Sequence, residues 1–151
     1  MITRSQLLFA ALIVTSLVQA AYGQSSGCRA LEGAWHVTIT DSDPAPSPGD
    51  FVTMITFTGE TTIEHDGRPG WGPAIGAYSC DGGRTFKATW LKHIWDPATG
   101  NLLVIVKIRA TIKVVSDNEY TSEDTFDIYA PNGTLISNNK ATAVGKRIVA
   151  E

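Results

Sequence analysis

GAWHVTIT, residues 33–40, alternates apolar and polar side chains after a glycine, which is the pattern of a β-strand with one buried face. Seven more runs rich in β-branched and aromatic residues follow it, most of them bounded by Gly, Pro, Asn or Asp. These runs are FVTMITFT (51–58), TTIEH (61–65), IGAYSC (75–80), RTFKATWLKHIW (84–95), NLLVIVKIRATIKVV (101–115), YTSEDTFDIYA (120–130) and TLISNNKATAVGKRIV (134–149). Beyond residue 23 no segment has convincing helical periodicity. The chain is therefore predicted to be all-β, as an antiparallel sandwich or barrel.

The N-terminal residues have the composition of a secretory signal peptide. Arg4 is their only charge, an apolar run covers residues 7–18, and small residues follow up to Gly23. The alternative is a membrane anchor, but the run is short for crossing a bilayer. Cleavage of residues 1–23 is expected to leave residues 24–151 as the mature domain, with no stable membrane insertion.

Length, composition and charge limit the number of domains and the classes of partner that the chain can have. The chain of 151 residues is 43% hydrophobic, which is enough for one core and little room for two. It carries 12 Lys and Arg against 15 Asp and Glu, so its net charge of −3 becomes −4 once Arg4 is removed. A protein without a basic surface is not expected to bind nucleic acid.

Cys28 and Cys80 are the two cysteines of the chain. In an oxidising compartment two cysteines most simply form one disulfide, here closing a loop worth roughly 4 kcal/mol in chain entropy. Free thiols or a metal pair are the alternative, but no CxxC or Cys/His spacing supports a metal site. The leader and the cysteines together predict an exported protein, periplasmic or extracellular.

Charges suggest a register for the hairpin that turns at residues 117–119. A three-residue loop there places Lys113 opposite Glu123 and Arg109 opposite Asp127 on one face. The other face then carries Asp124 opposite Ile112. The preceding hairpin is expected to align Phe86, Trp90 and Ile94 with Ala110, Val106 and Leu102, which makes Lys87 face Arg109.

The motif Gly33-Ala34-Trp35 on the first strand, an exported chain and a count of eight strands together resemble the lipocalin and wider calycin family. The family pattern is G-x-W near the start, with an Arg or Lys on the last strand that packs across the Trp. The resemblance implies one up-and-down barrel whose end Trp35 closes, with Arg147, or failing that Lys146, stacked on the indole. The second lipocalin motif, T-D-Y, is missing and no helix is expected after the last run, so the resemblance is to the broader calycin-like barrel.

Such barrels mostly bind small apolar molecules, and the inward-facing side chains would line the cavity. The expected ligand-binding residues are Phe86, Trp90, Val106, Ile108, Ile112, Asp124 and Phe126. Asp124 is also expected to meet Lys140 across the turn at residues 131–133. That pair would anchor a polar ligand head or act as an acid and base, or it is an ordinary ion pair in water.

Motifs for catalysis or for a cofactor are absent from the sequence. There is no G-x-S-x-G, HExxH or phosphate-binding loop, and His36, His65 and His93 lack ligand spacing, so neither a metal nor a cofactor is expected. The leading hypothesis is a non-enzymatic protein that binds a small hydrophobic molecule. One alternative is a cavity isomerase or cyclase using Asp124 or Lys140. Another is a secreted inhibitor or surface-interaction protein that uses the Pro-rich loop at residues 41–50 and Trp71, whose ring lies over the barrel mouth or packs on its rim.

Overall fold

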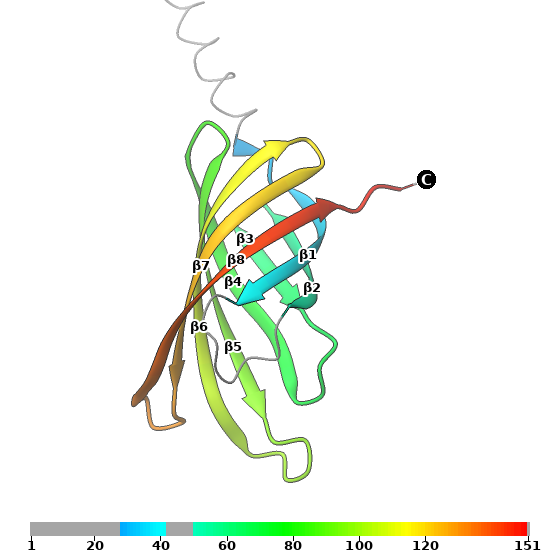
Figure 1. The fold of residues 1–151 in the computed structure, drawn as a ribbon. Helices are drawn as coiled ribbons and strands as arrows, with labels where there is room; N and C mark the ends of the chain where they lie inside the picture. The colour runs from blue at the N-terminus through cyan, green and yellow to red at the C-terminus, as the bar shows by residue number, and fades with distance from the viewer. Residues whose placement is uncertain (1–27, 42–49, 151) are drawn as a thin grey trace, which may run out of the picture.

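The computed structural model describes residues 28–41 and 50–150. Its strands are β1 (Gly33–Asp41), β2 (Phe51–Thr58), β3 (Thr61–His65), β4 (Trp71–Gly82), β5 (Thr85–Trp95), β6 (Leu102–Ser116), β7 (Glu119–Tyr129) and β8 (Leu135–Arg147). Each strand pairs with the next in antiparallel fashion, and β8 pairs with β1 to close an eight-stranded barrel (Figure 1). The predicted up-and-down barrel is confirmed. The expected signal peptide and most of the Pro-rich loop lie outside the described residues.

Strict alternation along the strands builds the core. In β5 and β6 every second side chain is buried or half-buried, and these side chains meet those of β1, β2 and β7 inside the barrel. Figure 1 shows that β6, β7 and β8 reach further toward the lower end of the view than β1 and β2. We call the opposite end, where β1 begins and β8 ends, the closed end.

The strand that contains Trp71 begins earlier than the sequence predicts. The expected run began at residue 75, but Trp71 already pairs with Ile94 and β4 runs from there, with an irregularity before Ala74. Gly and Pro at these positions therefore mark a bulged strand start, a place where both residue types are tolerated.

Two predicted registers are wrong by two residues. In the hairpin of β6 and β7, Lys113 faces Thr121 and Asp124 faces Ala110, because the turn is one residue tighter than expected and a bulge lies between Val114 and Ser116. A similar irregularity before Trp95 pairs Phe86 with Ile112, Trp90 with Ile108 and Lys87 with Thr111. The expected contact between Lys87 and Arg109 is therefore absent, and Lys87 pairs with Asp81 instead.

Slips of two residues keep every side chain on its predicted face. Asp124 is therefore buried on the inner face as expected. Arg109 and Asp127 also form their expected ion pair, although they are diagonal rather than direct neighbours.

The predicted pairing of Asp124 with Lys140 is wrong. Asp124 faces Ala141 on β8, while Lys140 is the partner of Thr125 and is exposed on the outer face. The cause is the register shift between Ile128 and Tyr129, which moves β8 by one residue and so reverses its faces. Lys140 is thereby removed from the cavity and from the proposed acid–base pair.

The predicted disulfide is confirmed. Cys28 and Cys80 are bonded, with their Cα atoms 5.3 Å apart, and they tie the segment before β1 to the end of β4. The bridge fixes the chain at the closed end, where the structure also packs the fully buried aromatic side chains of Trp35, Tyr120, Phe57 and Phe86.

Candidate functional site

Trp35 and Arg147 close one end of the barrel. Trp35 is fully buried, and the Arg147 guanidinium carbon lies 4.2 Å from the centre of its ring. The indole Nε1 donates to the Leu31 carbonyl at 2.9 Å. Arg147 in turn donates to three main-chain carbonyls, those of Ala30, Glu32 and Asp117. The guanidinium thus stacks on the indole and ties β8 to two other segments.

Two glycines are required at this end by close packing. Gly33 has a φ of 123°, and a Cβ there would come within 2.6 Å of Arg147 Nη1. The glycine of the opening motif therefore makes room for the guanidinium of Arg147. Gly145 has no counterpart in the sequence prediction, and a Cβ at this position would overlap the ring of Tyr120.

Aromatic rings fill the closed end. Trp35 and Tyr120 meet edge-on with ring centres 4.9 Å apart, and Phe57 contacts Tyr78 at 5.2 Å. Phe86 packs on Tyr78 in this cluster. Phe86 was expected to line the ligand cavity, but it is not among the lining residues and belongs to this packed end.

A cavity of about 250 Å³ occupies the rest of the interior. Six of the seven expected ligand-binding residues line it, namely Trp90, Val106, Ile108, Ile112, Asp124 and Phe126. Three aliphatic side chains of β1 and β2, those of Val37, Ile39 and Ile55, also line it. The residues that line the cavity toward the end away from Trp35 include Phe51, Arg68 and Trp71. The wall is mainly apolar and aromatic, with a few polar groups, as is usual for small-molecule sites.

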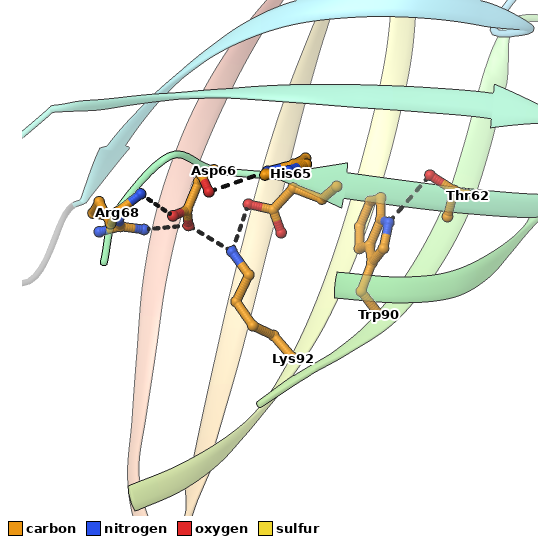
Figure 2. Close-up of polar contacts among 7 residues, drawn as sticks. Thr62, His65, Asp66, Arg68, Trp90 and Lys92 are labelled. Carbon is orange, nitrogen blue, oxygen red and sulfur yellow. Dashed lines mark hydrogen bonds and ion pairs between the residues drawn. The ribbon is translucent and has the colours of Figure 1, made fainter. Parts of the chain in front are cut away.

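A buried ionic network lies on one side of this cavity and was missed by the sequence prediction. Lys92 is only 2% exposed, and its Nζ lies 3.0 Å from Glu64 Oε1 and 2.6 Å from Asp66 Oδ2. Figure 2 shows Lys92 reaching from β5 toward the carboxylate of Asp66, just beyond the end of β3. Beside it, Trp90 Nε1 donates to Thr62 Oγ1 at 3.1 Å.

Arg68 extends the network toward the exterior. Its guanidinium donates to Asp66 Oδ2 at 2.8 Å. It is also stacked between two rings, with its Cζ 3.5 Å from the centre of Trp71 and 4.0 Å from that of Phe51. Burial alone would raise the pKa of Asp66, but hydrogen bonds from Arg68 and Lys92 outweigh it and lower that pKa. Asp66 is therefore held as a carboxylate between two cations.

The sequence contained one usable signal for this network. On β3 the alternation rule places Ile63 in the core, yet Ile63 is 51% exposed and the polar Thr62 and Glu64 face inward. On β5, however, the alternation places Lys92 on the same inward face as Trp90 and Ile94. A lysine on the buried face of a strand needs an acidic partner, and that requirement points to Glu64 and Asp66.

Asp124 stands apart from the network. It is 7% exposed and lines the cavity, and its Oδ1 is buried without a hydrogen-bond partner. Burial raises the pKa of Asp124 to about 6, with a further contribution from the negative charge of Glu64, although a hydrogen bond from Ser122 opposes both. It is a carboxyl group in an apolar cavity whose charge is not matched by a cation.

Within the part of the chain that the structure describes, no three His, Cys, Asp or Glu side chains gather as a metal ion would require. His36, His65 and His93 are each exposed on a different strand. No helix among residues 28–41 and 50–150 has the length and apolar character needed to cross a membrane.

Comparison with known proteins supports the fold. No protein-family model matches the chain, and no curated protein matches it either. The solved structure of EF1p2_mFAP2b bound to DFHBI superposes with a TM-score of 0.56 at 18% identity, covering 80% of this chain and 95% of that one. A redesigned β-barrel, mFAP0, bound to DFHBI, gives a TM-score of 0.32 at 18% identity over 78% of this chain and 99% of that one. The first likeness shows a shared barrel fold, and the second is too low to add to it.

Proposed function

We propose that the chain is an exported, calycin-like barrel that binds a small, mostly apolar molecule in its interior. The observation that carries this proposal is the cavity of about 250 Å³ within a barrel whose closed end is tightly packed. A barrel that served only as a rigid scaffold would be expected to fill this space with side chains, since protein interiors are normally close-packed. EF1p2_mFAP2b was solved with DFHBI bound, but at 18% identity it supports the fold alone. The proposal therefore depends on this chain's own cavity.

Further support comes from the closed end. Trp35 under a stacked Arg147 is the arrangement that the calycin resemblance implies, and β1 and β8 bring the two residues together.

The disulfide agrees with an oxidising compartment, which supports export. Export is tested by expressing the full chain in a bacterial host and measuring the intact mass of the secreted protein. Loss of about the first 23 residues is expected, and recovery of the uncleaved chain from the cytoplasm would contradict export.

Binding is tested with N-phenyl-1-naphthylamine, an uncharged apolar probe that fluoresces more strongly out of water. Ala110 lines the cavity, so Ala110→Phe should occupy it and weaken probe binding by about tenfold or more. The matched control is Thr111→Phe, because Thr111 is the next residue along β6 and is exposed on the outer face. Absence of probe binding by the unchanged protein, or equal binding by both variants, would contradict the proposed cavity site.

An acid–base enzyme is the second candidate, and Asp124 is the observation that favours it. Burial keeps its pKa near 6, which is close to the range useful for proton transfer at neutral pH. The two lysines that could act with Asp124 argue against this role, because Lys92 is engaged by two carboxylates and Lys140 lies on the outer face of the barrel. A binding site in which Asp124 is a recognition group therefore agrees better with the geometry than an isomerase or cyclase.

A further inference from the structure

We propose that the ligand of this cavity carries a protonated amine that pairs with the carboxylate of Asp124. The inference rests on the proposed binding function and specifies the chemical class of the ligand. That class is a compact aromatic or branched aliphatic amine that is cationic at neutral pH.

The charged side chains around the cavity include one more carboxylate than cations. Lys92 and Arg68 are the cations, and they are matched by Glu64 and Asp66 in one connected network. Asp124 is left as one unbalanced negative charge, with no cation near enough to bond its Oδ1. A buried carboxylate without a partner is costly, and a ligand ammonium would remove that cost by supplying the missing donor.

The surroundings of Asp124 leave the ligand as the source of that donor. Its cross-strand neighbours on β6 and β8 are Ala110 and Ala141. Glu64 on β3 is a like charge, and Tyr120 on β7 is a neighbour whose pKa Asp124 helps to raise, after the larger effect of burial. The cavity residues of β1 and β2 are aliphatic or aromatic: Val37, Ile39, Phe51 and Ile55.

Aromatic rings strengthen the preference for a cation. Trp90, Tyr120 and Phe126 line the same cavity as Asp124. The faces of such rings attract ammonium groups, most strongly where water is excluded. An anionic ligand would instead meet Asp124 and Glu64 as like charges, while the two cations are already engaged by carboxylates.

The test compares three probes that share one ring system: 1-naphthylmethylamine, 1-naphthylmethanol and 1-naphthoic acid. Each displaces N-phenyl-1-naphthylamine from the purified protein at pH 7.5. The amine is expected to bind about tenfold tighter than the alcohol or more, and the acid is expected to bind most weakly. The readout is the ratio of the amine and alcohol Kd values, so a general weakening of binding leaves it unchanged.

Asp124→Asn is expected to reduce that ratio to near one, because the amide has the same shape without the charge. Glu123→Gln, which removes a charge from the exposed neighbour on the same strand, is the matched control and should leave the ratio as it is. The ratio should also fall as the pH is lowered from 7.5 to 4.5 in the unchanged protein, and it should not do so in Asp124→Asn.

Three outcomes would overturn the inference while leaving the cavity site intact. They are equal affinity for the amine and the alcohol, tightest binding of the acid, and an amine preference that survives Asp124→Asn. Failure of every probe, including N-phenyl-1-naphthylamine, would instead overturn the proposed function itself. Circular dichroism of each variant establishes that it is folded.

Discussion

Arg147 and Trp35 are direct cross-strand partners on β8 and β1, and the guanidinium lies over the indole at 4.2 Å. Their contact forms where the first and last strands meet, which is the seam that converts a sheet into a barrel. The same guanidinium reaches main-chain carbonyls before β1 and after β6. One side chain thus links three parts of the chain at the closed end.

Trp35→Ala is expected to lower the free energy of unfolding by about 3–5 kcal/mol, because it empties a fully buried aromatic site. Urea unfolding followed by circular dichroism measures the change. The control is Trp95→Ala, since Trp95 is 42% exposed, and its cost should be about 1 kcal/mol or less. Equal costs for the two variants would mean that the indole of Trp35 does not close the barrel.

Arg147→Ala is expected to cost about 2–3 kcal/mol, through the lost stacking contact and the unpaired carbonyls. Arg147→Lys should recover only part of this loss, because an ammonium lacks the planar fork that reaches several acceptors. Lys146→Ala is the neighbouring control. Lys146 is exposed and paired with Glu119, so its loss should cost at most about 1 kcal/mol. A cost for Arg147→Ala as small as that of the control would contradict the closing role.

Reduction of the bond between Cys28 and Cys80 should destabilise the fold by roughly 4 kcal/mol, given the 52-residue separation of the two cysteines. A domain of this size should then melt at a temperature lower by about 10 °C or more. Calorimetry with and without reductant measures the shift. A double Cys28→Ala, Cys80→Ala variant should melt like the reduced protein and should not respond to reductant; an unchanged melting temperature would contradict the prediction.

Much of the fold could be predicted from the sequence, because burial on a strand follows a period of two that local sequence displays directly. Registers were less predictable, since each depends on where a bulge adds one residue. Shifts of two, as between Lys113 and Thr121, kept every predicted face. A register shift of one residue at Tyr129 exchanged the inward and outward faces of β8, which placed Lys140 outside the cavity.

The ionic network shows a different limit. Its acidic members lie on β3 and just after it, where the polar side chains face inward and Ile63 faces solvent. The usual rule, apolar side in, therefore gives the wrong face for this short strand. The reason becomes visible only when the fold brings Lys92 of β5 within ion-pair distance of those carboxylates across β4, which is a tertiary relationship that no local pattern encodes.

Lys92→Met is expected to cost about 3–5 kcal/mol at neutral pH, because Glu64 loses its buried cation and Asp66 loses one of two. The pKa of Asp66 is lowered in the folded protein, so this stabilisation is present above its ordinary value of 3.8 and is lost as the pH falls further. The measured cost should therefore shrink in acid. Urea unfolding at pH 7 and at pH 2.5, well below the ordinary pKa of the carboxyl group, measures the difference.

The rescuing variant for this prediction is Glu64→Gln combined with Lys92→Met. It removes one charge of each sign and leaves the pair of Asp66 and Arg68 in place. It should regain a substantial part of the lost stability at pH 7. A double variant no more stable than Lys92→Met would mean that lost packing, and not an unmatched buried charge, explains the cost.

Asp124→Asn is expected to stabilise the ligand-free protein in a pH-dependent way. Burial raises the pKa of Asp124 from 3.8 to about 6 in the folded state, so the folded protein holds this proton more tightly than the unfolded chain. Stability contributed by the group is therefore complete below pH 4 and declines as the pH rises to about 6, by at most roughly 3 kcal/mol. The variant lacks this decline, so its advantage should be small at pH 4 and largest above pH 6.

Urea unfolding at intervals from pH 4 to pH 8 measures this advantage as the difference in free energy between the two proteins. Glu123→Gln should show no comparable rise, because Glu123 lies on the exposed face of the same strand. A difference that stays constant across this range would mean that Asp124 titrates as it does in the unfolded chain. The cavity would then hold no unmatched charge, and the reason to expect a cationic ligand would be lost with it.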